Sequence, residues 1–305
     1  MATFYDTHKN AGVLSAAIPA ISIMIIVDTI GIIANSLVIM ITIFAMSLRS
    51  TTNYLLAMQC FFDSIHVLAH YYLAYVLYSG KNFDTLPTCF FIMAVPLTGL
   101  SIGMSLIFFT AVDRLFAVLL PSKHQKLNKV LYLGSILAIC MGYNVYILYI
   151  GYLNAKQHKD TMVICLIIEG LHGTPSTVWS AIATGLVFTA VFIYIIIGIC
   201  IHRKFNSNVN TRKLYKSLFI LCILMTFSWV LSCVNGILSS VFNLSEELAF
   251  FIPLYVGITI NVACGSNFFI LTRYSKEYRI AAKDFFERIG IQGVFKPASK
   301  TFPWM

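Results

Sequence analysis

Three ionisable side chains share one face of a single apolar stretch. His66 and His70 follow Asp63 by three and seven residues, and these spacings place side chains on the same side of a helix. Carboxylate and imidazole groups inside a membrane carry protons, bind ions or mark a ligand path. A His pair at i and i+4 can also bind zinc, but the pattern supplies no third ligand. Packing inside a helix bundle or contact with a ligand is therefore the favoured interpretation of the two histidines.

A second chemical pair lies at the end of another apolar stretch. Arg114 directly follows Asp113 and lies 25 residues beyond Cys89. As a helix these residues cover about 37 Å, which exceeds the ~30 Å hydrocarbon core, so Cys89 and Arg114 are expected on opposite faces of a membrane. Arg114 stays charged in a protein, and Asp113 is a neighbouring carboxylate partner. Taken alone, the pair is most simply explained as charged side chains at a helix end that extend to the lipid headgroups.

The composition is that of a membrane protein that crosses the bilayer several times. Hydrophobic residues make up 59% of the chain and charged residues 11%, and the mean hydropathy is +0.83. Each apolar run is uniformly apolar, whereas the strands of a barrel would alternate with period two over about 10 residues. Seven runs of spanning length predict an all-α bundle of seven transmembrane helices: 12–46, 54–79, 89–120, 130–153, 177–202, 214–242 and 248–272.

The positive charges predict the orientation of the chain. Only four of the 21 lysines and arginines fall on the side that holds the N-terminus, namely Lys9, Lys81, Lys156 and Lys159. The excess on the other side places the C-terminal tail in the cytoplasm. The net charge of +9 therefore indicates topology and attraction to acidic lipid headgroups, and no basic cluster with interleaved aromatics suggests a nucleic acid partner.

The same pattern divides the chain into three regions. Residues 1–11 are expected to be an extracellular N-terminus, 12–272 the seven-helix domain and 273–305 an amphipathic helix with a short cytoplasmic tail. The start of the chain has no signal-peptide pattern, so the first helix is expected to insert uncleaved. The helix after residue 273 would lie along the inner membrane surface, and it contains no cysteine for a palmitoyl anchor. Its apolar face comprises Tyr278, Ile280, Ala281, Phe285 and Ile289.

Two of the eight cysteines fall outside the expected helices or at their outer ends. Cys89 lies at the outer end of the third run, and Cys165 is the other cysteine of an external segment. A Cys89–Cys165 disulfide is therefore predicted, and it would hold the second outer loop across the mouth of the bundle. The remaining cysteines lie inside helices, where a thiol behaves as a small hydrophobe.

The polar motifs, taken in order, resemble a rhodopsin-class (class A) G-protein-coupled receptor over nearly the whole chain. Asn35 in IIANSLVI is similar to the GN-x-x-V motif, and Asp63 stands at the position of the family's buried acid. Asp113-Arg114-Leu115 resembles the DRY motif, and Asn267 falls where NP-x-x-Y begins. The LRSTTNYLLAMQ and DRLFAVLLP segments are most similar to the nematode serpentine chemoreceptors of the Srsx type.

The resemblance implies a receptor in the plasma membrane, with its N-terminus outside, that binds a small extracellular molecule and activates a heterotrimeric G protein. It implies no cofactor. Asp113 and Arg114 would form the coupling site, and Asn35, Asp63 and Asn267 a polar network that relays the signal. The implied ligand pocket comprises His70, Pro96, Leu97, Leu100, Met104, Trp229 and Asn261.

The chain departs from the family pattern at several positions. Pro96 stands where amine receptors carry an aspartate, which favours a small neutral or weakly polar ligand. Phe268 and Leu271 replace the proline and tyrosine of NP-x-x-Y, so a proline bend is not expected there. Gly103 and Ala263 replace polar residues that bind sodium beside the family's acid, which argues against a sodium site.

Two other classes of protein were weighed. A transporter or channel could use Asp28, Asp63, His66 and His70 as a proton or ion path. The sequence has none of the internal repeats that transporters of this size usually carry. A membrane enzyme has no support, because no Ser/His/Asp, HExxH or phosphate-loop pattern occurs.

Overall fold

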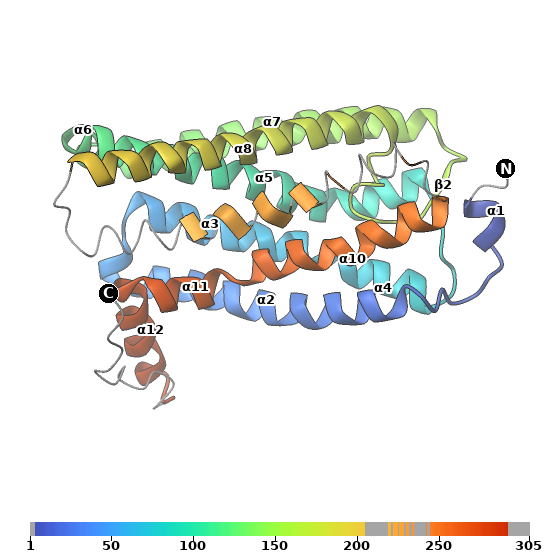
Figure 1. Ribbon diagram of the computed structural model, residues 1–305, viewed down its shortest axis with the longest axis horizontal. Coiled ribbons are helices and arrows are strands. Elements are labelled where there is room, and N and C mark those ends of the chain that lie inside the picture. The colour runs from blue at the N-terminus through green and yellow to red at the C-terminus, as the bar shows by residue number, and fades with distance from the viewer. Residues whose placement is uncertain are drawn as a thin grey trace.

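The computed structural model describes residues 4–204 and 245–291, together with 219–220, 222–224, 226–228, 230–231, 234 and 242. Within these residues the protein is all-α apart from two short strands of two residues each, which pair with one another (Figure 1). The elements are α1 (Phe4–His8), α2 (Ile18–Phe44), the 3-10 turn η1 (Met46–Leu48), α3 (Thr51–His66), α4 (Leu68–Tyr78), β1 (Asp84–Thr85), α5 (Leu86–Leu119), α6 (Pro121–Gln125), α7 (Lys129–Gln157), β2 (Met162–Val163), α8 (Gly173–Lys204), α10 (Glu246–Gly265), α11 (Asn267–Tyr274) and α12 (Lys276–Arg288).

The long helices run side by side along one axis (Figure 1). Four of them, α2, α5, α7 and α8, are long and apolar enough to cross a membrane, and a fifth span follows if the bent pair α10 and α11 counts as one. α1 and β2 lie at one end of the bundle, and α6 and α12 at the other. The predicted sixth run, 214–242, lies for the most part outside the described residues.

α5 is the central helix. In an 18-residue apolar stretch of α5, 72% is buried inside the protein. The corresponding share is 22% for α7 and 33% for both α2 and α8. The other helices turn large apolar side chains outward, including Ile26 of α2 and Phe192 of α8, each at least 60% exposed. In a membrane these side chains meet lipid, so the polar residues of the interior face α5 or one another.

Two of the predicted helices are interrupted. The second run, predicted as one helix over 54–79, consists of α3 and α4, which break at Val67. The seventh bends by 46° between Gly265 and Asn267, although no proline lies there. A Gly–Ser pair is a known site of helix kinks, and Gly265-Ser266 supplies it. Gly265 is also required for close packing, because a Cβ there would lie 3.0 Å from Gly31 Cα on α2.

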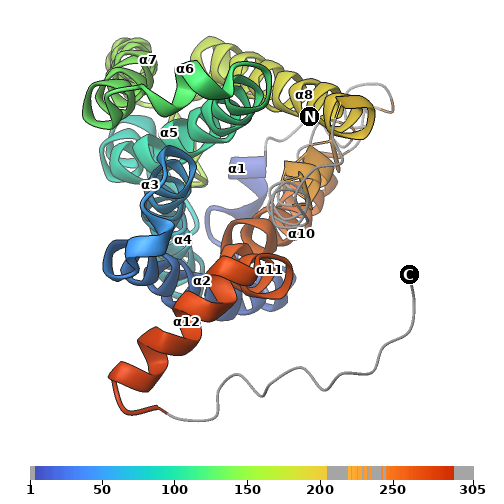
Figure 2. The ribbon, with the colours of Figure 1, turned by 90° about the vertical axis from the view of Figure 1, so that its left-hand side faces the viewer.

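The two ends of the bundle are closed differently. At the end that holds the N-terminus, called the outer end below, β1 pairs antiparallel with β2, and Asp84 lies opposite Val163. The opposite end is called the inner end. At the inner end α12 turns away from the bundle axis and projects outward (Figures 1 and 2). Ser275 caps α12 by accepting a hydrogen bond from Tyr278 N at 3.4 Å, and Tyr278 and Ala281 are buried against the bundle. The predicted amphipathic helix is therefore present.

Candidate functional site

The carboxylate of Asp113 gathers donors from three segments at the inner end of α5. Arg114 donates from Nη2 at 2.8 Å and from Nε at 3.2 Å, both to Oδ2. Thr52 donates to the same oxygen at 2.5 Å, and Thr51 donates to Oδ1 at 3.0 Å. His124 of α6 places Nε2 2.8 Å from Oδ1. Both carboxylate oxygens are therefore fully engaged, and Asp113 is 0% exposed.

This arrangement follows from where helices begin and end. Ser50 caps α3 by accepting from Asn53 N, so that Thr51 and Thr52 form the first turn beside α5. Pro121 opens α6, which turns back and brings His124 to the carboxylate. The sequence analysis singled out Asp113 and Arg114 but missed Thr51, Thr52 and His124. Only the close packing of α3 against α5 makes the two threonines donors, and no motif indicates it.

A second polar cluster joins three helices in the interior. The Asn267 amide donates to Asn35 Oδ1 at 3.2 Å and to Asp63 Oδ2 at 3.4 Å. Asn35 in turn donates to the carbonyl of Cys264 at 3.2 Å. The three residues predicted as a polar network are thus in contact, and each is at most 3% exposed. Gln59, which the sequence analysis missed, adds a donor to Asp63 at 3.5 Å.

The surroundings of Asp63 are apolar where a sodium ion would need ligands. A Cβ at Gly103 would lie 2.9 Å from Asp63 Oδ1, so this residue presents only backbone to the carboxylate. Ala263 is buried and brings no oxygen from its side chain. Sodium binds through several oxygen ligands, and these two positions supply no side-chain oxygen.

A third cluster connects α2, α4 and α10. His70 Nδ1 lies 2.8 Å from Asp28 Oδ2, and the side chain of Asp28 is fully buried. The Asn261 amide lies 3.4 Å from the same imidazole nitrogen. Asp28 Oδ1 has no hydrogen-bond partner among the described residues. The sequence analysis named Asp28 and His70 as members of one possible ion path without pairing them.

The two histidines of the second run do not converge on a common point. His66 Nδ1 lies 3.9 Å from Cys264 Sγ, whereas His70 turns to Asp28. Among the described residues no group of three or more His, Cys, Asp or Glu is placed to hold a metal ion. Both imidazoles instead contact the seventh span.

The residues predicted for the ligand pocket are found in the core. Pro96, Leu97, Leu100 and Met104 are buried on α5, and His70 meets Asn261 as described above. Trp229, the remaining member, lies outside the described residues. The sequence analysis missed Trp179 of α8, which is buried in this region and donates to Ser101 Oγ at 2.9 Å. Asn144 likewise donates to Thr98 at 3.1 Å, so α5 is tied to both α7 and α8 near Pro96.

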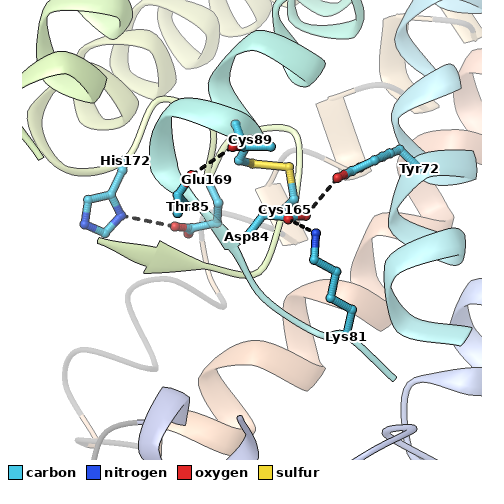
Figure 3. Close-up of a disulfide and its surroundings, with 9 residues drawn as sticks. Tyr72, Lys81, Asp84, Thr85, Cys89, Cys165, Glu169 and His172 are labelled. Carbon is cyan, nitrogen blue, oxygen red and sulfur yellow. Dashed lines mark hydrogen bonds and ion pairs between the residues drawn. A yellow bond between two sulfur atoms is a disulfide. The ribbon is translucent and has the colours of Figure 1, made fainter. Parts of the chain in front are cut away.

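The outer end holds the predicted disulfide. Cys89 and Cys165 are bonded across 76 residues and fasten the β2 segment to the start of α5 (Figure 3). Beside it Asp84 accepts from Tyr72 at 2.8 Å and pairs with Lys81. Figure 3 also shows His172 directed at Glu169, with the two atoms 3.4 Å apart.

A hollow of about 660 Å³ lies next to this loop. α1 forms one wall, where Tyr5 packs edge-on against Phe83 at 5.1 Å between ring centroids. His8 holds α1 to the start of α10 through Glu247 at 3.1 Å. The other lining side chains are mostly apolar, with acidic groups and one histidine: Phe4, Asp160, Met162, Val163, Ile164, Leu166, Glu169, His172, Phe250 and Pro253.

The polar clusters described above lie within a stretch of the chain that matches one receptor family. Residues 28–286 match the family model described as serpentine type 7TM GPCR chemoreceptor Srsx. The chain belongs to the Srsx chemoreceptor family. This confirms the resemblance drawn from the motifs, and with it the all-α seven-transmembrane class. A search of curated proteins found no match for this Srsx chemoreceptor.

Proposed function

We propose that this Srsx chemoreceptor binds a small extracellular molecule within its helix bundle and activates a heterotrimeric G protein at its inner end. The chain would lie in the plasma membrane with its N-terminus outside and its C-terminal tail in the cytoplasm. The match to a chemoreceptor family supports a sensory role. The observation that carries the coupling proposal is the engagement of Arg114 by a fully buried Asp113.

The arrangement of Arg114 suits a resting receptor. The guanidinium makes two hydrogen bonds to one carboxylate oxygen, and the side chain is 19% exposed. In the active state Arg114 would leave Asp113 and contact the docked G-protein helix. A ligand shifts this equilibrium only if it binds the active state more tightly, with about 1.4 kcal/mol for each tenfold change.

The ligand would enter through the hollow beside the disulfide and reach Leu97, Leu100 and Met104 on α5. Apolar side chains dominate the proposed pocket, and His70 and Asn261 are its polar members, 3.4 Å apart. A site of this kind accepts a small neutral or weakly polar molecule. Signals would pass inward through Asn267, which contacts both Asn35 and Asp63.

A transporter or channel is the competing function. It would use Asp28, Asp63, His66 and His70 as an ion path. All four groups contact side chains of other helices: Asp28 and His70 contact each other, Asp63 contacts Asn267 and His66 contacts Cys264. Such contacts favour a role in holding the helices together.

The test compares wild type with Arg114→Ala in cells that express a promiscuous G protein and receive a panel of small neutral odorants. Arg49→Ala is the matched control, because it removes another arginine of the same membrane side whose side chain is exposed. We expect a wild-type response that is lost in Arg114→Ala and kept in Arg49→Ala at equal surface levels. A response that survives Arg114→Ala but disappears in Asp63→Asn would contradict coupling through Arg114. Ion flux in reconstituted vesicles without G protein would then support the channel.

A further inference from the structure

A groove of about 700 Å³ lies at the inner end of the bundle, outside the clusters described above. It runs between the last turns of α2, the η1 turn and α12. Its walls are formed mainly by apolar side chains: Met40, Ile41, Phe44, Ala45, Met46, Ala281, Phe285 and Ile289. Ser47, Asp284 and Arg288 add polar groups to the lining.

The groove opens toward the hydrocarbon of the inner leaflet. Phe44 and Met46 are 63% and 79% exposed, and Ile289 on the opposite wall is 52% exposed. α2 is a membrane-spanning helix, and α12 leaves the bundle at its inner end and projects outward (Figure 2). Apolar side chains exposed at this depth meet lipid chains rather than water. The occupant that fits such walls is an acyl chain.

The rim of the groove carries two opposite charges that form no ion pair with the described residues. Asp284 and Arg288 are four residues apart on α12, and both are exposed. No ion pair joins either residue to another charged group in the part of the chain that the structure describes. On the same helix Lys283 and Glu287 do pair, at 3.6 Å. A carboxylate and a guanidinium left open beside an apolar groove complement a headgroup that carries both signs.

We infer that this groove binds a phospholipid with an ethanolamine headgroup. One acyl chain lies along the rings of Phe44 and Phe285, which contact each other with centroids 6.0 Å apart. The phosphate pairs with Arg288, since guanidinium binds phosphate with two parallel hydrogen bonds. The ammonium donates to Asp284. Choline has no N–H to donate, and an acidic headgroup would be repelled by Asp284, so ethanolamine fits best.

A bound lipid would have a structural role at α12, because this helix contains no cysteine. No cysteine occurs in 265–291, so no residue of α12 can carry a palmitoyl chain. A bound lipid chain would supply the same anchor without a covalent bond. This inference concerns the inner leaflet and does not depend on which extracellular ligand the receptor binds or on its coupling to a G protein.

The receptor is purified and placed in nanodiscs of phosphatidylcholine that contain a trace of phosphatidylethanolamine with a diazirine near the carboxyl end of one acyl chain. After irradiation, mass spectrometry locates the labelled residues. We expect labelling within 40–47 and 281–289. Unlabelled phosphatidylethanolamine should remove it, whereas phosphatidylglycerol, added phosphatidylcholine and free phosphoethanolamine should not. Equal competition by all lipids, or labelling spread along the outer face of α2, would overturn the inference.

Variants separate the groove from the headgroup. Ser47→Phe, at an exposed position, fills the groove and should reduce labelling about tenfold, as should Arg288→Gln, which removes the phosphate partner. Lys283→Gln is the matched control, because it removes one positive charge from the same helix outside the groove. Unchanged labelling in Ser47→Phe, or equal losses in Arg288→Gln and Lys283→Gln, would overturn the site. Retention of the wild-type thermal midpoint confirms that each variant is folded.

Discussion

His70 Nδ1 lies 2.8 Å from Asp28 Oδ2. This contact joins α2 to α4 through two residues that are 42 positions apart in the sequence. Removing one partner of a buried pair leaves the other uncompensated, and this costs about 3 kcal/mol. We therefore expect Asp28→Leu to lower the free energy of unfolding by roughly that amount. Thermal unfolding followed with a thiol-reactive dye measures it, since Cys60, Cys140 and Cys264 are buried.

The double variant provides the control for this pair. Replacing both partners by apolar residues is often close to neutral, so Asp28→Leu with His70→Leu should recover most of the loss. Ile30→Ala changes the same helix at a position 50% exposed to lipid, and it should shift stability by no more than about 0.5 kcal/mol. A double variant as unstable as Asp28→Leu alone would show that the two residues are not coupled.

The hydrogen bonds around Asp113 predict that variants of this cluster raise basal activity, by an amount that depends on how many of these bonds are lost. Asp113→Asn removes the charge that holds Arg114 and should raise basal nucleotide exchange about tenfold. Thr52→Val removes one donor at 2.5 Å and should give a smaller rise, about threefold. Thr110→Val is the matched control, because Thr110 Oγ1 is buried on the same helix and has no hydrogen-bond partner among the described residues. Basal activity that stays at the wild-type level in Asp113→Asn would contradict a resting state in which Asp113 holds Arg114.

The disulfide predicts a loss of stability at the outer end. Closing a long loop in the unfolded chain stabilises a fold by about 2–4 kcal/mol. Cys89→Ser with Cys165→Ser should therefore lower the thermal midpoint and surface expression, as should reduction of the wild type. Cys140→Ala alters a buried free thiol and should leave the response to reductant unchanged. Equal midpoints with and without reductant in the wild type would argue against a stabilising bridge.

The contact between α5 and the break in the second span predicts a strict requirement for glycine. A Cβ at Gly99 would lie 2.5 Å from His66 N and 2.6 Å from Phe62 O, both backbone atoms. Gly99→Ala should therefore push the helices apart and cost about 1–3 kcal/mol. Gly142→Ala is the matched control, since a Cβ there meets nothing within 4 Å. Similar thermal midpoints for the two variants would show that the helices separate freely at this point.

Tyr278 predicts a difference at alkaline pH. Its hydroxyl lies 3.0 Å from Thr42 Oγ1, and burial raises the pKa of Tyr278 above its ordinary value of 10. Because the folded state favours the neutral phenol, its contribution to stability is complete below pH 10 and decreases as the pH rises above that value. Tyr278→Phe should cost about 1 kcal/mol at neutral pH.

The comparison across pH isolates this one tyrosine. The stability difference between wild type and Tyr278→Phe should shrink above pH 10, because only the wild type loses this contribution. Unfolding by denaturant at several pH values measures the difference directly, and the other tyrosines cancel between the two proteins. A difference that is constant up to pH 11 would show that Tyr278 is not held neutral by the fold.

The sequence predicted the features that depend on local pattern. Apolar runs located the helices, and the positions of Cys89 and Cys165 relative to these runs led to the disulfide. Motif order brought Asn35, Asp63 and Asn267 together, and they are in contact. Their roles in signalling remain predictions, as do those of the pocket residues.

The features that the sequence did not predict depend on how helices are rotated against each other. Asp28 and His70 each lie on an inward face, but only the packing of α2 against α4 turns one toward the other. In the sequence Thr51 and Thr52 are typical of an ordinary helix start. They donate to the Asp113 carboxylate because α5 ends beside them. The bend at Ser266 was missed because the expectation rested on proline, whereas Gly265-Ser266 produces it.

That bend has a mechanical consequence. Asn267 is the first residue after it, and one amide group makes the contacts to Asn35, Asp63 and the Cys264 carbonyl. A rotation of residues 267–274 about Ser266 would withdraw this amide from α2 and α3 in the same step. In such a rotation residues 267–274 would move as one unit about Ser266, while α10 would stay packed on α2 through the Gly31–Gly265 contact.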